Sequence, residues 1–199
     1  MSENSNNYLQ SLNQFQREAV ENNSGATLVL AGAGSGKTRV LTYKLLHLLA
    51  QKILKPNQIL AVTFTNKAAS EMKFRVSKML NFPIDKMWMG TFHSLSLKIL
   101  RKNYEKIGLK KNFVIIDTDD QIKLIKKICE QENIDTKDIP AKFFSNAIDG
   151  LKNKGIFFNE LKSNKYRNND EELRLVYKIY QQELNRINCV DFGDLILLC

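Results

Sequence analysis

Residues 31–38 decide the fold, and they read Ala31-Gly32-Ala33-Gly34-Ser35-Gly36-Lys37-Thr38. A short apolar run, residues 27–30, precedes this stretch and is typical of a buried parallel strand. Residues 39–50 follow it with apolar side chains at helical spacing. The order is therefore strand, glycine-rich turn and helix, which is the context of a phosphate-binding loop of the pattern G-x-x-x-x-G-K-[ST]. Ala31 stands in the first position of that pattern, where glycine is usual.

The chemistry of this loop suits the phosphates of a nucleoside triphosphate. Its glycines let the backbone curl so that successive N–H groups point at an anion, and the following helix adds the partial positive charge of its N-terminus. We expect Lys37 to reach the β- and γ-phosphates and the Thr38 hydroxyl to bind Mg²⁺. A chance glycine turn is the alternative, and the strand and helix predicted on either side argue against it.

The rest of the first hundred residues continues the alternation of strand and helix. Residues 59–64 and 87–89 read as further buried strands, and residues 67–80, which carry an apolar face, read as the helix that connects them. Such a unit predicts an α/β fold with a parallel sheet and flanking helices. Short helices over residues 11–20 and 95–104 complete this part.

From about residue 111 the pattern becomes mostly helical. Residues 113–116 form one more short apolar run, and Thr118-x-x-Gln121 matches a capping box for a helix over residues 121–131. Further helices are predicted over residues 141–151, 157–161 and 170–187, and another begins near Asp191. Because strands do not alternate with these helices, we interpret residues 111–186 as a separate, mostly helical subdomain.

Composition and charge narrow the classes of partner. The chain has 199 residues and a formal net charge of +9, which favours a polyanionic partner, although solubility alone would also account for the charge. No apolar run approaches the ~18 residues of a membrane span, and no signal peptide is visible. The cysteines Cys129, Cys189 and Cys199 fit no metal-binding spacing. We therefore expect a cytoplasmic protein with no membrane partner.

Several further motifs occur in one order along nearly the whole chain. They are Leu12-Asn13-x-x-Gln16, residues 31–39, Thr63-Phe64-Thr65-Asn66-Lys67-Ala68-Ala69-x-Glu71-Met72, Gly90-Thr91-Phe92-His93-Ser94 and Asp191-Phe192-x-Asp194-Leu195. In these motifs the chain resembles the N-terminal part of a superfamily 1 DNA helicase of the UvrD/Rep/PcrA type. The resemblance implies a partial RecA-like ATP-binding domain, called 1A, with an inserted helical subdomain, called 1B.

The resemblance assigns an ATP site to the loop and its surroundings. Lys37 and Thr38 take the catalytic positions, with Thr38 on Mg²⁺, and Gln16 and Arg39 lie against the adenine. An amide such as that of Gln16 both donates and accepts, as the adenine edge requires. The implied ATP-binding residues are Gln16, Ala31, Gly32, Ala33, Gly34, Ser35, Gly36, Lys37, Thr38 and Arg39. Taken alone, Gln16 and Arg39 could also be ordinary residues on exposed helix faces.

The resemblance also implies contacts with single-stranded DNA and with junctions between single- and double-stranded DNA. The implied residues are Phe64, Thr65, Asn66 and Lys67 after one strand, and Thr91, Phe92 and His93 after the next. The carboxyl ends of parallel strands are where such sheets bind ligands. Hydroxyl and amide groups suit DNA phosphates, and an aromatic ring can stack on a base. The alternatives are that Phe64 lies in the core, that Asn66 merely caps a helix and that His93 is structural.

By this resemblance, residues 1–110 of the chain correspond to the first part of domain 1A and residues 111–186 correspond to subdomain 1B. Residues 187–199 correspond to the return of the chain to domain 1A. Two departures stand out: glycine at position 193, where relatives usually have Asp, and Ile148, near which relatives often have Lys. The family's next strand, ending in Asp-Glu, and its second RecA-like domain lie beyond residue 199. We therefore expect this chain alone to hydrolyse ATP poorly without a C-terminal half. The alternatives are an inactive nucleotide- or DNA-binding fragment and the helicase arm of a RecB/AddA-type helicase–nuclease.

Overall fold

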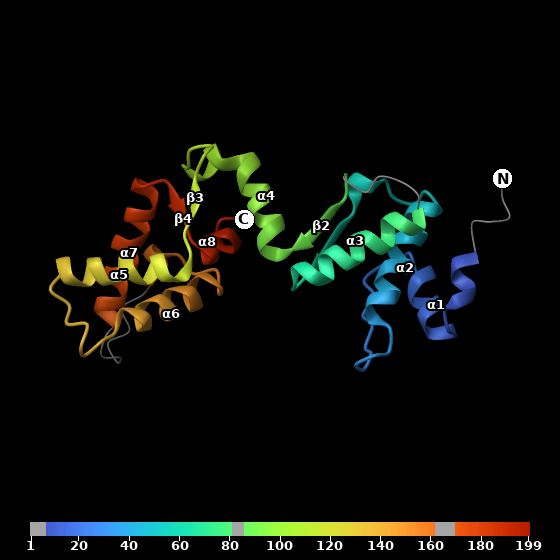
Figure 1. Ribbon diagram of the computed structural model, residues 1–199, viewed down its shortest axis with the longest axis horizontal. Coiled ribbons are helices and arrows are strands. Elements are labelled where there is room, and N and C mark those ends of the chain that lie inside the picture. The colour runs from blue at the N-terminus through green and yellow to red at the C-terminus, as the bar shows by residue number, and fades with distance from the viewer. Residues whose placement is uncertain (1–6, 81–85, 162–169) are drawn as a thin grey trace. The chain divides into compact units, whose positions relative to one another are not determined.

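A computed structural model describes residues 7–80, 86–161 and 170–199 of the chain. The chain divides into two compact units, Met1–Phe92 and His93–Cys199 (Figure 1). Both units are mixed α/β, mostly helical, and each contains one small parallel sheet. The expected α/β class is thus confirmed in this coarse form. No helix in the described ranges is both long and apolar enough for a membrane span.

The first unit is built on a strand–helix–strand motif. Strand β1 (Leu60–Thr63) pairs in parallel with β2 (Trp88–Thr91), and helix α3 (Asn66–Leu80) lies between them in the chain. This confirms the predicted unit. Helices α1 (Gln14–Glu21) and α2 (Lys37–Ala50) precede it, with 3₁₀ turns at Asn7–Ser11 and Pro56–Gln58. Its core contains Leu45, Ile59, Ala61, Met72, Val76, Met87 and Met89.

Of the buried strands expected in this unit, one does not form and one is buried only in part. Residues 27–30 form no strand, and Leu28 and Leu30 are 82% and 84% exposed. An apolar run becomes a buried strand only where neighbouring strands take its backbone bonds, and within the described residues β1 and β2 pair only with each other. Residues 59–64 do contain a strand, but only Ile59 and Ala61 are buried, because a single face of β1 is covered.

The second unit is a helical assembly around a short parallel pair. Helix α4 (Phe92–Asn103) and a 3₁₀ turn (Tyr104–Ile107) lead to β3 (Val114–Ile115), which pairs with β4 (Cys189–Val190). Between these strands come α5 (Thr118–Gln131), α6 (Ala141–Lys152), a 3₁₀ turn (Phe158–Glu160) and α7 (Asp170–Arg186), and α8 (Phe192–Leu197) follows β4. Phe144, Ile148, Tyr177, Tyr180 and Leu184 are fully buried in its main core.

The helices predicted in this unit are confirmed, with two local corrections. Asp117, not Thr118, caps α5, because its carboxylate accepts the backbone N–H of Asp120 at 2.9 Å. The helix therefore begins at Thr118, three residues before the predicted start at Gln121. The short helix expected over residues 157–161 is only a 3₁₀ turn.

Candidate nucleotide and DNA sites

The glycine-rich loop has the backbone geometry that its sequence predicts. Gly34 and Gly36 have φ values of 76° and 89°, a conformation that side-chain-bearing residues rarely adopt. Gly36 also caps α2, and its carbonyl accepts the N–H of Val40 at 2.9 Å. A β-carbon at position 36 would lie 2.9 Å from Gln16 Nε2. The backbone angle therefore favours glycine here, and a β-carbon would in addition require the flexible Gln16 amide to shift.

Lys37 folds back over its own loop. Its ammonium donates to the carbonyl oxygens of Ala31, at 2.8 Å, and Gly32, at 2.6 Å. The Ser35 hydroxyl donates to the same Gly32 oxygen at 2.6 Å. Lys37 and Thr38 are both exposed at the start of α2, where the helix N-terminus also favours an anion. An anion can therefore reach the ammonium, the Thr38 hydroxyl and the loop amides from solvent.

Gln16 and Arg39 connect the N-terminal segment to this loop. Gln16 forms a reciprocal capping box with Asn13, and its Nε2 donates to the Ser35 carbonyl at 3.2 Å. Arg39 donates to the Ser11 carbonyl at 2.6 Å, and its guanidinium carbon lies 5.4 Å from the centre of the Tyr43 ring. Both side chains thus lie beside the loop, on its α1 side. Their assignment to adenine stays a prediction.

Thr38 is the one residue predicted to bind a metal. Its hydroxyl is exposed on the first turn of α2, but the described residues hold no cluster of three or more His, Cys, Asp or Glu side chains. Mg²⁺ usually takes one or two protein oxygens together with substrate phosphates and water. Thr38 fits the part of a single ligand to a nucleotide-bound Mg²⁺, and the residues described here supply no separate cage for the ion.

The carboxyl ends of β1 and β2 bring most of the predicted DNA residues of the first unit together. Phe64 is 90% exposed and its ring centre lies 5.7 Å from that of Phe92, which is half exposed. The alternative of a core Phe64 is therefore excluded. Thr65, not Asn66, caps α3, because its hydroxyl oxygen accepts the Ala68 N–H at 3.1 Å.

The remaining members of the predicted DNA set differ in exposure. Asn66 and Lys67 are exposed beside Thr65, whereas Thr91 is buried opposite Thr63 in the sheet register. A buried hydroxyl is poorly placed to contact DNA directly. Asn66 and Lys67 are therefore better candidates than Thr91 for contacts with phosphates.

His93 lies in the second unit and has an aromatic partner that the sequence prediction missed. Its ring centre lies 6.0 Å from that of Phe192, edge to face, and Phe192 is about half exposed. The signal was available, because Phe192 follows the capping residue Asp191 in a motif quoted above. An aromatic residue at the first position of a short capped helix is held in place by the cap, and it can therefore form part of a stacking surface.

A buried ionic network holds α8 and thereby Phe192. The Lys152 ammonium lies 2.7 Å from both Asp191 Oδ2 and Asp194 Oδ1, and all three side chains are at most 3% exposed. The Tyr180 hydroxyl donates to Asp191 Oδ2 at 2.8 Å. Asp191 and Asp194 also cap α8 reciprocally. Burial raises the pKa of Asp194 and the Lys152 ammonium opposes that rise.

Gly193 is explained by this network. A β-carbon there would lie 2.8 Å from Lys152 Cδ and 3.1 Å from Lys152 Cβ. The glycine thus leaves the space through which the Lys152 stem reaches the two carboxylates. Ile148, the other noted departure, is fully buried in the core one helical turn before Lys152.

The chain is similar to known proteins over nearly its whole length. A model of the UvrD/REP helicase N-terminal domain matches residues 12–199. The ATP-dependent DNA helicases PcrA of Staphylococcus epidermidis and Staphylococcus aureus are 43% identical to the chain over 192 residues. The match covers 96% of this chain and 26% of each relative, so the chain spans about a quarter of their length. The chain therefore belongs to the UvrD/REP helicase family and matches its N-terminal domain.

Proposed function

We propose that this chain is the ATP-binding N-terminal part of an ATP-dependent 3′–5′ DNA helicase that acts in repair or replication. The observation that carries the proposal is the loop: two left-handed glycines, a lysine over the loop carbonyls and a helix N-terminus. In this proposal residues 1–110 and 187–199 belong to RecA-like domain 1A and residues 111–186 to subdomain 1B. With DNA as the substrate, the cytoplasm is the expected compartment.

The proposed roles follow from the charge of each side chain and from the ligand atoms that it can contact. When the triphosphate arrives, the Lys37 ammonium exchanges two neutral carbonyls for phosphate oxygens, which form stronger, charge-assisted hydrogen bonds. The loop amides and the α2 N-terminus stabilise the remaining phosphate charge. A bound Mg²⁺ would supply further neutralisation of that charge, with the Thr38 hydroxyl as one of its ligands. Gln16 and Arg39 are the proposed adenine contacts.

DNA is proposed to bind beside this site, at the carboxyl ends of β1 and β2. Phe64 and Phe92 offer exposed aromatic faces to bases, while Asn66 and Lys67 offer donors to the backbone. The net charge of +9 supports a polyanionic partner, and the binding should weaken as salt rises. The PcrA relatives are named as ATP-dependent DNA helicases, which supports both ligands.

Lys37→Ala tests the nucleotide site. We expect it to weaken binding of a fluorescent ATP analogue about 10- to 100-fold, because one charge-assisted contact is lost. Lys86→Ala is the matched control, since Lys86 is also exposed and lies outside the loop. Unchanged affinity in Lys37→Ala would remove the phosphate assignment.

The alternative is a nucleotide- or DNA-binding fragment without ATPase activity. Phosphate release from radiolabelled ATP separates the two, measured with and without oligothymidylate and with and without a C-terminal half from a PcrA relative. DNA-stimulated release would exclude the inactive fragment. No release under any of these conditions would exclude the motor role for this chain.

A further inference from the structure

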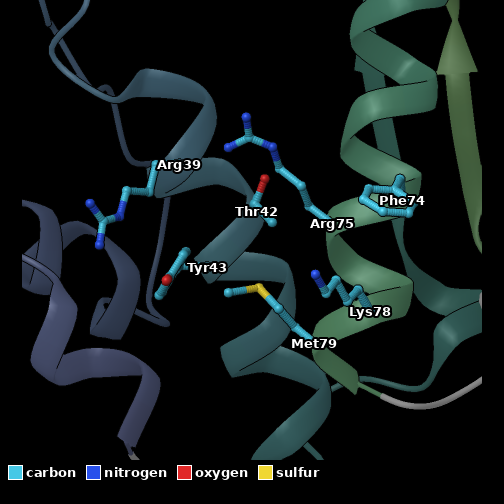
Figure 2. A pocket seen from close by; sticks show the side chains of 7 residues that line it. All are labelled: Arg39, Thr42, Tyr43, Phe74, Arg75, Lys78 and Met79. Atoms are coloured by element: carbon cyan, nitrogen blue, oxygen red, sulfur yellow. The ribbon is translucent and has the colours of Figure 1, made fainter.

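Two contacts fix the guanidinium of Arg39. One of its terminal N–H groups donates to the Ser11 carbonyl at 2.6 Å. Its guanidinium carbon lies 5.4 Å from the centre of the Tyr43 ring, one turn further along α2, which is within the range of a cation–π contact. Figure 2 shows the two side chains next to each other along α2. Ser11 is the hydrogen-bond partner of Arg39 among the described residues, so most of the guanidinium N–H donors remain available.

The Ser11 carbonyl is itself held in place by the N-terminal turn, Asn7–Ser11. The Ser11 hydroxyl lies 3.1 Å from the Tyr43 hydroxyl, and the Tyr8 hydroxyl lies 3.1 Å from Nδ1 of the buried His47. Both tyrosines also pack against a small core that consists of Leu9, Val20 and Val40. Polar and apolar contacts therefore attach this turn to α2, and with it the carbonyl that accepts from the guanidinium.

The two side chains that are proposed to contact adenine meet at Gly36. A β-carbon on this glycine would lie 2.9 Å from Gln16 Nε2 and 3.7 Å from Arg39 Cβ. The Gln16 amide donates to the Ser35 carbonyl at 3.2 Å, so it too is held at the loop. The amide and the stem of the arginine thus flank one point of the loop, as a shared contact with one base requires.

An arginine that is already ordered binds a ligand more tightly than a free one. A free arginine side chain loses rotamer entropy when a ligand orders it, and this loss weakens binding. The Ser11 carbonyl binds the edge of the Arg39 guanidinium and the Tyr43 ring lies beside it, while the positive charge is kept. A planar guanidinium stacks on aromatic rings, and adenine is one.

We propose that Tyr43 is a positioning residue of the nucleotide site, whose ring supports the Arg39 guanidinium so that it meets adenine in a fixed orientation. The Ser11 carbonyl of the N-terminal turn is the second support. This inference rests on the proposed function, because it takes ATP as the ligand of the loop and Arg39 as a contact of the base. The affinity for the base, but not the affinity for the phosphates, therefore depends on Tyr43.

The test compares ATP with inorganic tripolyphosphate, which carries the phosphates without a base. Each is titrated with Mg²⁺ into the full 199-residue chain by isothermal titration calorimetry. We expect Tyr43→Leu to weaken ATP binding about two- to fivefold, as the loss of an exposed cation–π contact does, and to leave tripolyphosphate binding unchanged. Tyr43→Phe keeps the ring and should keep the ATP affinity of the unsubstituted chain.

Arg39→Ala provides a second readout. In the Arg39→Ala background, Tyr43→Leu should cause no further loss of ATP affinity, because a positioning residue acts only through the side chain that it positions. Val20→Ala is the matched control for packing, because Val20 is fully buried in the small core against which Tyr43 packs. We expect this control to leave the ratio of the ATP affinity to the tripolyphosphate affinity unchanged.

Three results would overturn the proposal. They are equal weakening of ATP and tripolyphosphate binding in Tyr43→Leu, an unchanged ATP affinity in that variant, and the same loss in the Arg39→Ala background. If the unsubstituted chain binds tripolyphosphate as tightly as ATP, the phosphate site stands but the base contact, and this inference with it, is wrong. If it binds neither ligand, the proposed function itself fails.

Discussion

Lys152→Met should destabilise the second unit through two uncompensated carboxylates. The substitution keeps most of the apolar stem but removes the ammonium that lies 2.7 Å from both Asp191 and Asp194. Asp191 retains the Tyr180 hydroxyl, and Asp194 retains the Gln181 amide at 3.3 Å. Each carboxylate also still accepts a backbone N–H of the α8 cap, but none of these remaining donors carries a charge. Breaking a buried ion pair on one side costs about 3–5 kcal/mol. That is a large part of the 5–15 kcal/mol that stabilises a typical domain.

The loss of stability in Lys152→Met should be smaller at low pH. This pH dependence distinguishes an effect of charge from an effect of altered packing. Burial already raises the pKa of Asp194, and the variant lacks the ammonium that opposes the rise. A carboxyl whose pKa is higher in the folded than in the unfolded state binds its proton first in the folded state. The variant should therefore gain stability as the pH falls from 7 toward about 4, the pKa of an unfolded Asp.

Urea unfolding followed by circular dichroism at pH 7 and pH 5 measures both effects. Lys154→Met is the control, because Lys154 is exposed two residues away and its loss should change the free energy of unfolding by less than about 0.5 kcal/mol. The double variant Lys152→Met/Asp194→Asn should recover part of the loss at pH 7, since one carboxylate is gone. A loss below about 1 kcal/mol at pH 7, or one that is the same at pH 5, would refute the buried network.

Three further predictions concern single features of the structure. Gly193→Ala should cost about 1–3 kcal/mol in urea unfolding with no change between pH 7 and 5, because it crowds the Lys152 stem without removing charge. Phe64→Ala should weaken oligothymidylate binding about 5- to 100-fold by loss of base stacking, whereas Phe74→Ala, also exposed, should leave it unchanged in the same anisotropy titration. Burial and the nearby Lys44 lower the pKa of His47 in the folded chain. The unfolded chain therefore binds a proton at this imidazole first, and stability should fall as the pH drops below about 6.5. His47→Gln should make this fall smaller, as measured by thermal unfolding at several pH values.

Local features of the fold could be predicted from the sequence because their causes are local. The start of α8 near Asp191 follows from Asp191 and Asp194, three residues apart. The helix expected from residue 11 begins instead at Gln14, because Asn13 and Gln16 form its capping box. The glycine-rich loop and the helix that follows it could be predicted for the same reason. An error of a few residues arose at α5, where two adjacent residues, Asp117 and Thr118, both suit the capping position.

Features that depend on distant residues could not be predicted. Lys152 is 39 residues from Asp191, and no pattern in the sequence indicates that its ammonium is buried there. The pairing of β3 with β4 joins residues 75 positions apart in the register of Val114 with Cys189. The failed strand at residues 27–30 belongs to this class, because an apolar run specifies a strand only together with its neighbours. The glycine at position 193 likewise depends on the stem of Lys152, which is distant in the sequence.

The position of Lys37 bears on how the loop responds to a nucleotide. Its ammonium holds the carbonyls of Ala31 and Gly32, and those residues directly follow the exposed apolar run. Under the proposed function, a triphosphate draws the ammonium away, and both carbonyls lose their partner but remain accessible to water, which can replace it at small cost. The exchange is favourable because charged phosphate oxygens accept hydrogen bonds more strongly than neutral carbonyls. Under the proposed function, nucleotide binding would therefore release the carbonyls of residues 31 and 32 from the Lys37 ammonium at the start of α2.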